Sequence, residues 1–295
     1  MTPLSLSGSM TALATPFRDG AVDAEAFQRF CAWQIEQGTD ALVPCGTTGE
    51  SATLDFDEHK RVIELCLEVA KGKVPVIAGT GANATKEAIY LTLHAQQAGA
   101  DAVLLVTPYY NKPTQEGLYQ HFKAVHDATD VPIVLYNVPG RTAVDMSAAT
   151  VARLAKLERI IGIKDATSDL NRPAETRILV GEAFVQLSGE DASIIPFLGN
   201  GGHGCISVTA NVAPRLTAEL HDRWQAGDIV GARKINDRLM PLHRALFAET
   251  SPAPTKYALS LLGLFRNELR LPLVPIGPET EAKVTKAMQQ AGLIN

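Results

Sequence analysis

The chain has 295 residues, of which 46% are hydrophobic and 20% charged, so it is long enough to bury one large core, with or without an appendage. Its formal net charge of −5 and pI near 5.8 argue against nucleic acid or an anionic membrane as a partner. The first residues lack the basic and apolar regions of a signal peptide, and no apolar run reaches the length of a membrane span. We therefore expect a soluble, cytoplasmic protein.

The cysteines and histidines give no pattern of a disulfide framework or a metal site. The four cysteines are scattered and form no CxxC pair, which is typical of reduced thiols in a cytosolic protein. The seven histidines show no HExxH or similar spacing. We expect neither a metal nor a cofactor.

Short apolar runs alternate along the chain with longer segments of helical periodicity. The apolar runs, which predict strands, begin at Ser9, Ala41, Val74, Ala102, Pro132, Ile160, Phe184 and Gly204. Examples of the segments that predict helices between them are residues 23–38, 57–72, 85–99 and 146–157. Several of these helices are followed by a glycine, as helix C-termini prefer: Gly38, Gly72 and Gly99.

This alternation, at about 30 residues per unit, predicts βαβ units and a parallel sheet. Eight units fit within residues 1–225, which is the size of a (β/α)8 TIM barrel that carries the catalytic site. Residues 226–295 are helical in pattern, and we expect them to form a C-terminal helical region. An open doubly wound sheet is the rival interpretation, because it has the same alternation.

One glycine-rich turn tests that rival. Gly79-x-Gly81-x-x-Ala84 follows an expected strand and precedes an expected helix, as a dinucleotide-binding turn would. Such a turn also needs an acidic residue at the end of the next strand to hold the ribose. The next strand instead runs into Thr107, and Asp101 lies at its opposite end. The dehydrogenase interpretation therefore fails, and the barrel is favoured.

Polar residues gather where the expected strands end, and chemistry sits at the carboxyl ends of the strands in a barrel. The second strand ends in a loop, residues 46–51, whose hydroxyls and backbone N–H groups suit a small carboxylate or phosphate. The later strand ends supply phenols, a guanidinium, an amine and other polar groups: Tyr109, Tyr110, Tyr136, Arg141, Lys164, Glu190 and His203.

Lys164 ends an apolar run, Ile160 to Ile163. Taken alone, it is best explained as the first solvated residue after a strand, just as Tyr136 could be a core aromatic and Arg141 a loop charge. The alternative is a buried lysine, in which desolvation favours the neutral, nucleophilic amine. Together, an amine, phenols, an arginine and an anion-holding loop on one face indicate Schiff-base chemistry on a small oxo-acid.

Five motifs lie at these strand ends: GTTGESATL (46–54), VTPYYNKPTQEGLYQHF (106–122), LYNVPGRT (135–142), IIGIKDAT (160–167) and GGHGCISVTANV (201–212). In this order they resemble the dihydrodipicolinate synthase family of pyruvate-dependent class I aldolases and lyases. The wider superfamily, which includes N-acetylneuraminate lyase and keto-deoxy sugar-acid enzymes, shares the barrel and the lysine. The second and third motifs resemble the synthases more than those relatives.

The resemblance implies that Lys164 forms an imine with pyruvate and that Thr47 and Thr48 bind the pyruvate carboxylate. Tyr136 is then the general acid and base, and Thr47 links it to Tyr110 in a proton relay. In this family the tyrosine at the position of Tyr110 reaches into the neighbouring subunit's site. The resemblance therefore implies a homo-oligomer, usually a tetramer built as a dimer of dimers.

Two further implications concern the pocket and the reaction. Arg141 would hold the carboxylate of L-aspartate 4-semialdehyde, and Gly189 with Ile206 would line the pyruvate pocket. The implied product is 4-hydroxy-tetrahydrodipicolinate, which feeds diaminopimelate and lysine synthesis. Another pyruvate-dependent aldolase or lyase is the alternative within this chemistry, and a non-catalytic barrel that retains the pocket is the alternative outside it.

Many members of the family are feedback-inhibited by L-lysine at a dimer interface. The corresponding residues here are Ser51, Ala52, Leu54, His59, Asn83, Glu87 and Tyr109. Glu87 could pair with the ammonium group of the ligand, whereas Phe56 departs from the histidine that is common in responsive members. The resemblance thus implies an allosteric lysine site, with Phe56 as its main departure.

Overall fold

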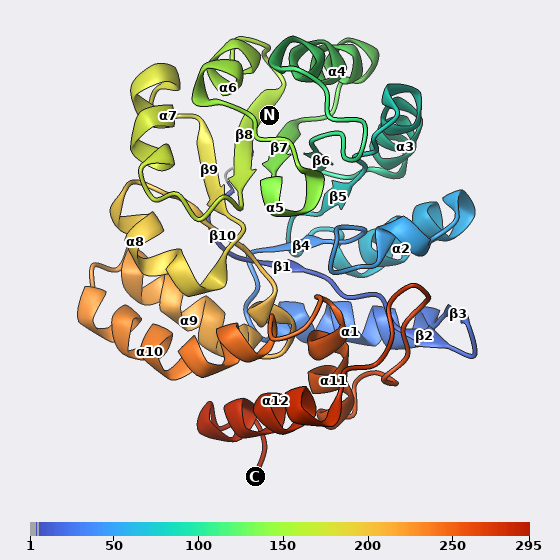
Figure 1. Cartoon of the computed structure of the whole chain (residues 1–295), viewed down its shortest axis with the longest axis vertical. Coiled ribbons are helices and arrows are strands. Elements are labelled where there is room, and N and C mark those ends of the chain that lie inside the picture. Colours follow the sequence, from blue (N-terminus) through green and yellow to red (C-terminus); the bar gives the residue numbers. More distant parts are fainter. Residues whose placement is uncertain (1–3, 5) are drawn as a thin grey trace.

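The computed structural model describes residue 4 and residues 6–295, and its centre is a barrel of eight parallel strands (Figure 1). The strands are β1 (Gly8–Ala12), β4 (Ala41–Val43), β5 (Ile77–Gly79), β6 (Ala102–Val106), β7 (Ile133–Asn137), β8 (Ile160–Asp165), β9 (Val185–Ser188) and β10 (Gly204–Ser207). Their order is β4-β1-β10-β9-β8-β7-β6-β5, and a parallel bridge between Leu42 and Val76 joins β4 to β5. The predicted barrel is therefore confirmed, and the open sheet is excluded.

Helices surround the barrel and follow its strands in sequence. They are α1 (Ala24–Glu36), α2 (Phe56–Ala70), α3 (Thr85–Ala98), α4 (Gln115–Ala128), α5 (Pro139–Thr142), α6 (Ala148–Leu154), α7 (Arg172–Val180), α8 (Ile194–Gly199) and α9 (Pro214–Gln225). A short hairpin, β2 (Phe17–Arg18) with β3 (Ala21–Val22), precedes α1. No helix in the described part of the chain is long and apolar enough to cross a membrane.

Three more helices follow the eighth βα unit: α10 (Ile229–Ala245), α11 (Ala253–Leu261) and α12 (Pro278–Gln290). In Figure 1, α11 and α12 lie outside α1, on the side away from the strands. Leu239 and Leu242 of α10 are fully buried and join the same apolar cluster as barrel residues. The tail is therefore packed onto the barrel through a shared core.

Both faces of the barrel strands are buried, and side chains alternate between two apolar layers. In β6, Leu104 belongs to the cluster inside the barrel, whereas Val103 and Leu105 belong to the layer between strands and helices. In β7, Leu135 likewise packs outward and Tyr136 inward. This alternation follows from the two-residue period of a strand, and it turns every second strand residue toward the barrel interior.

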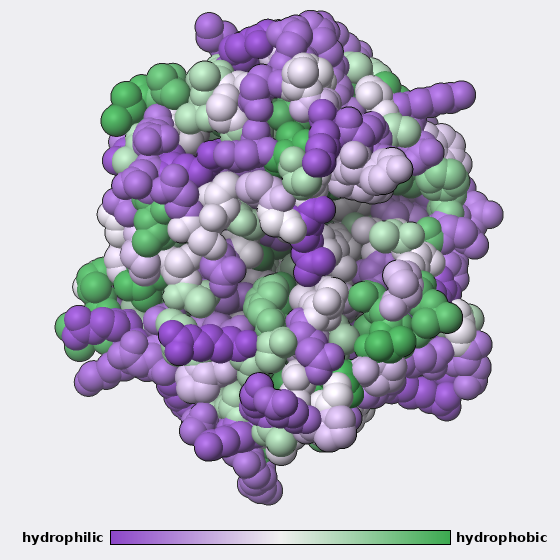
Figure 2. Space-filling model, in the orientation of Figure 1, coloured by the Kyte–Doolittle hydropathy of each residue, from purple (hydrophilic) through white to green (hydrophobic). Residues whose placement is uncertain are grey.

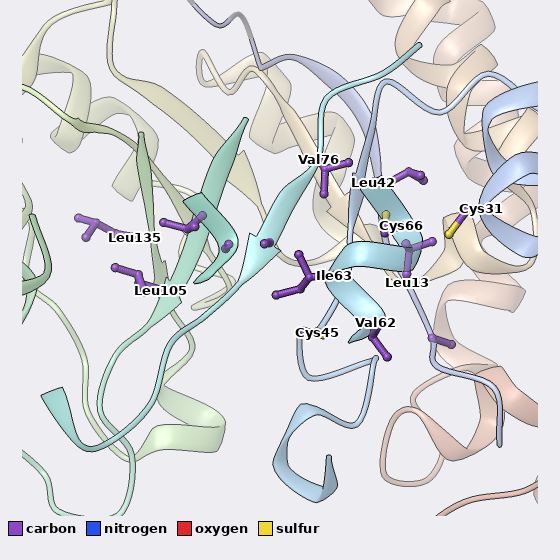
Figure 3. Packing of buried hydrophobic residues seen from close by; sticks show 14 of the residues in the cluster. Leu13, Cys31, Leu42, Cys45, Val62, Ile63, Cys66, Val76, Leu105 and Leu135 are labelled. Carbon is purple, nitrogen blue, oxygen red and sulfur yellow. The ribbon is translucent and has the colours of Figure 1, made fainter. Parts of the chain in front are cut away.

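The outer layer holds three of the four cysteines, Cys31, Cys45 and Cys66, and Figure 3 shows them among Leu13, Ile63 and other apolar side chains. All four cysteines are buried and unpaired, as the sequence predicted. Burial raises the pKa of the Cys31 thiol well above its ordinary value. Cys31 of α1 and Cys66 of α2 therefore act as small apolar groups between these two helices, whereas Cys205 of β10 packs in a separate apolar cluster.

Gly162 of β8 makes a close backbone contact that no other residue could make. An added Cβ would lie 2.5 Å from the carbonyl oxygen of Val185 in β9. We expect Gly162→Ala to lower the free energy of unfolding by about 1–3 kcal/mol, because one of the two strands must move. Denaturant unfolding followed by circular dichroism measures the change.

Gly140→Ala is the matched control, since nothing lies within 4 Å of the Cβ it would add. We expect that substitution to leave stability unchanged or to raise it slightly. Equal stabilities of the two variants would show that the β8–β9 contact is not tight.

Candidate active site

Lys164 and Tyr136 lie directly opposite each other in the pairing of β8 with β7. Both are almost fully buried, with 6% and 7% of their surface exposed. The Lys164 Nζ lies 4.2 Å from the centroid of the Tyr136 ring. The structure therefore brings together the predicted nucleophile and the predicted proton carrier, at the carboxyl ends of adjacent strands.

A cavity of about 120 Å³ opens at this end of the barrel. Figure 2 shows that the face of the molecule drawn in Figure 1 is hollowed near its centre. The lining includes six residues that the sequence predicted: Thr47, Thr48, Tyr136, Arg141, Lys164 and Gly189. An added Cβ at Gly189 would approach the Lys164 Cε to 3.1 Å, so glycine leaves room for the lysine side chain.

The loop of residues 46–50 forms one wall of the cavity, and its backbone is held by hydrogen bonds. The Glu50 N–H donates to the Thr47 carbonyl at 3.1 Å. The Thr15 hydroxyl donates to the Gly49 carbonyl at 2.8 Å. The two threonine hydroxyls of this loop therefore stand on a fixed turn beside the lysine.

A buried ion pair anchors the end of this loop. Glu50 has a left-handed backbone (φ +53°), and its Oε1 accepts from the Lys256 Nζ at 2.5 Å. Both side chains are completely buried, and the backbone N–H of Arg270 donates to the other Glu50 oxygen at 3.2 Å. The Lys256 Nζ also lies 4.0 Å from the centroid of the Phe17 ring.

Burial lowers the pKa of Lys256, and the nearby Glu50 charge opposes that shift. Removing either partner would leave an uncompensated charge in the interior, which is strongly destabilising. The pair therefore ties α11 to the loop that carries Thr47 and Thr48. Sequence analysis placed Glu50 in the loop but missed Lys256, because no local pattern links two residues 206 positions apart.

The C-terminal region also supplies part of the cavity wall, which the sequence did not predict. Phe247 and Ser251, from the segment between α10 and α11, line the cavity. The Ser251 carbonyl accepts from the Arg141 Nη2 at 3.3 Å. Arg141 is exposed at the mouth of the cavity, and this contact with the tail orients its guanidinium group.

A second cavity, of about 510 Å³, adjoins the first, and Thr47, Arg141 and Ser251 line both. Its lining includes six of the seven residues predicted for the allosteric site: Ser51, Ala52, Leu54, His59, Glu87 and Tyr109. Asn83 is not in the lining, although its carbonyl accepts from the Asn111 side chain nearby. Burial, with a smaller contribution from His94, lowers the pKa of His59 to about 4, so that imidazole is neutral at neutral pH.

Two predicted residues lie away from the smaller cavity. Tyr110 has 89% of its surface exposed and a positive φ of 72°, and it lines neither cavity. Ile206 is fully buried in the barrel interior, in the same apolar cluster as Tyr136, but is not among the lining residues. It pairs with Met10 of β1, so it supports the base of the site from within the barrel.

The residues that the structure describes contain no group of three or more His, Cys, Asp or Glu side chains that could hold a metal ion. The cavity offers an amine, a phenol, hydroxyls, a guanidinium and the carboxyl group of Glu190, whose pKa is raised by burial. That set can form a covalent imine with a carbonyl compound, move protons and bind carboxylates.

Comparisons with known proteins agree on one family. Residues 5–291 match the model of the dihydrodipicolinate synthetase family. The 4-hydroxy-tetrahydrodipicolinate synthase of Rhodospirillum centenum is 61% identical over 287 residues, which cover 97% of this chain and 99% of that protein. The crystal structure of the dihydrodipicolinate synthase of Acinetobacter baumannii complexed with pyruvate has a TM-score of 0.96 at 46% identity, covering 98% of this chain and 100% of that chain. The crystal structure of the Cyanidioschyzon merolae synthase with lysine bound has a TM-score of 0.95 at 38% identity, covering 98% of this chain and 99% of that chain.

The buried ion pair yields a stability prediction. Lys256→Met should lower the free energy of unfolding by about 3–5 kcal/mol, since it leaves the Glu50 carboxylate buried without its partner. The double variant Glu50→Gln/Lys256→Met should recover most of the loss, because no charge then stays buried. Denaturant unfolding of the wild type, the single variant and the double variant measures these free energies.

Lys123→Met is the control, because Lys123 forms an exposed ion pair with Asp127, and such pairs contribute little to stability. A Lys256→Met variant no less stable than Lys123→Met would refute the assigned role of the pair.

Proposed function

Because this chain belongs to the dihydrodipicolinate synthase family, we propose that it condenses pyruvate with L-aspartate 4-semialdehyde to give 4-hydroxy-tetrahydrodipicolinate. The observation that carries the proposal is the buried Lys164 facing Tyr136 in a cavity that also holds Thr47 and Thr48. The product would enter diaminopimelate and lysine synthesis.

The first half-reaction uses the lysine as a nucleophile. The Lys164 amine attacks the ketone carbon of pyruvate, and the resulting carbinolamine loses water to form an imine. The hydroxyls of Thr47 and Thr48 hold the pyruvate carboxylate, which directs the ketone toward the amine. Tyr136 gives a proton to the departing oxygen and exchanges protons in the later steps.

The second half-reaction joins the two substrates. Loss of a methyl proton converts the imine to an enamine, whose carbon attacks the aldehyde of the semialdehyde. The amino group of that substrate then attacks the imine carbon, which closes the ring and releases Lys164. Arg141 binds the carboxylate of the semialdehyde at the mouth of the cavity, since a guanidinium matches a carboxylate with two parallel hydrogen bonds.

Assembly with a second copy of the chain would complete the proton relay. Tyr110 is exposed and lines neither cavity of its own chain, and a positive φ at a tyrosine is a strained conformation. Phe56 and Tyr90, each 48% exposed, pack against each other, and Phe56 lines the larger cavity with Tyr109. Exposed aromatic groups of this kind are typical of an interaction surface. The proposed unit is a dimer in which Tyr110 reaches the partner's Thr47, with two such dimers forming a tetramer.

Lysine is the proposed feedback inhibitor, bound in the larger cavity. Glu87 offers a carboxylate to an ammonium group there, and a synthase with a similar fold has been crystallised with lysine bound. Phe56 stacks edge-on against Tyr90 with ring centroids 5.6 Å apart. That apolar wall suits the aliphatic stem of lysine, so Phe56 is compatible with the site.

Trapping tests the covalent mechanism. With pyruvate and borohydride, the wild-type protein should gain a reduced adduct on the peptide that contains Lys164, and Lys164→Ala should gain none and lose nearly all activity. Peptide mass spectrometry and a coupled assay with L-aspartate 4-semialdehyde measure the two effects.

Lys156→Ala is the control for the trapping experiment, since that lysine is exposed on the surface and should leave the adduct unchanged. An adduct elsewhere in the chain would contradict the mechanism. Turnover of N-acetylneuraminate or a keto-deoxy sugar acid, in place of the semialdehyde, would assign the chain to another aldolase of the superfamily.

The regulatory proposal predicts that millimolar L-lysine inhibits the wild-type enzyme. Glu87→Gln should weaken the inhibition by about tenfold, because one charge-assisted hydrogen bond to the ligand ammonium is lost. Initial rates at increasing lysine concentration measure the effect. Glu116→Gln, which changes an exposed carboxylate paired with Arg153, should respond to lysine like the wild type, and no inhibition of any variant would refute the proposal.

A further inference from the structure

The residues that follow Tyr136 and Lys164 also lie opposite each other. Asn137 of β7 pairs with Asp165 of β8 in the parallel register. Because successive strand residues point to opposite faces, these two side chains lie on the outer face of the barrel, under the helices. Asn137 is fully buried, and the Asp165 side chain is 10% exposed.

On the β7 side, Asn137 is held by the segment that joins α5 to α6. Its Nδ2 donates to the Asp145 Oδ1 at 2.7 Å. Its Oδ1 accepts from the backbone N–H of Met146 at 3.0 Å. Both polar atoms of the amide are therefore satisfied by two adjacent residues of one segment.

On the β8 side, Arg172 connects Asp165 to the same segment. Its Nε donates to the Asp165 Oδ2 at 2.8 Å, and its Nη2 donates to the Met146 carbonyl at 2.6 Å. The Nη1 lies 3.4 Å from the Asp145 carboxylate. The guanidinium thus contacts Asp165, Met146 and Asp145. It completes a ring of side-chain contacts that joins Asp165 of β8 to the two residues that hold Asn137 of β7.

The backbone pairing between β7 and β8 is irregular near the start of β7. The register shifts between Ile133 and Val134, which pair with Ile160 and Gly162. The shift leaves Ile161 without a partner on β7 and locally disrupts the ladder. The side-chain ring lies at the far end of the two strands, next to the two residues that must meet.

We propose that Arg172 is a positioning residue for the reaction of Lys164 with pyruvate. Arg172 binds Asp165 directly and binds the Asp145–Met146 segment that in turn holds Asn137. This linkage acts as a clamp that fixes the ends of β7 and β8 on the outer face and so holds Tyr136 against Lys164 on the inner face. Only arginine offers a planar fork that can donate to three acceptors at once. The inference rests on the proposed function, since it concerns the geometry of that same pair.

Arg172→Met tests the clamp, and steady-state kinetics with both substrates measures it. We expect kcat to fall by about tenfold to a hundredfold, because small misplacements of reacting groups have effects of that size. The KM for pyruvate should change by no more than about twofold, since the threonines of the loop of residues 46–50 lie on a distant part of the barrel. Arg172→Lys should stay well below the wild-type kcat, because an ammonium cannot replace the fork.

Arg177→Met is the matched control. Arg177 lies on the same helix, pairs with Glu182 at 3.4 Å and donates to the Asn200 carbonyl, so its loss removes similar contacts away from the site. We expect a wild-type kcat for that variant. Thermal unfolding of both variants separates stability from kinetics.

Equal kcat values for the two variants, or a kcat of Arg172→Met equal to that of the wild type, would overturn the clamp. So would a fall in the melting temperature of Arg172→Met without a fall in kcat. Failure of the proposed function would look different, because the wild-type protein itself would then give no borohydride-trapped adduct with pyruvate.

Discussion

The parallel pairing of β7 with β8 is the constraint on which the site depends. One register sets Tyr136 against Lys164 inside the barrel and Asn137 against Asp165 outside it. Because both faces of a barrel strand are buried, a slip of one residue would exchange these sets and move the amine into the outer apolar layer. The chemistry inside and the polar ring outside are therefore two consequences of the same backbone alignment.

The fold could be predicted because its signals are local. Each strand is a short apolar run and each helix has its own periodicity, so the order of elements can be followed along the sequence. The carboxyl ends of parallel strands converge at one end of a barrel, which is why Thr47, Tyr136, Arg141 and Lys164 could be expected to meet before their positions were known. The rule does not say how far below the cavity a strand residue lies. Ile206 also lies near the end of a strand, yet it packs with Met10 in the barrel interior and does not line the cavity.

The contacts that hold the site in shape could not be predicted in the same way. Glu50 and Lys256 are 206 positions apart, and Arg141 and Ser251 are 110 positions apart. Each of these residues, taken alone, resembles an ordinary polar residue in a loop or helix, and burial of the pair becomes evident only when distant elements are packed. A buried charge is a property of tertiary structure, since its stability depends on a partner that no local pattern identifies.

The link between Glu50 and Lys256 also has a consequence for the order in which the molecule matures. A chain emerging from the ribosome has all eight strands once residue 207 is made, and amino-terminal regions generally begin to fold first. At that stage the carboxylate of Glu50 has no ammonium to meet, because α11 has not yet been synthesised. The loop near the start of the chain thus receives its final support from one of the last helices to be made, and the nascent barrel becomes a finished enzyme only near the end of translation.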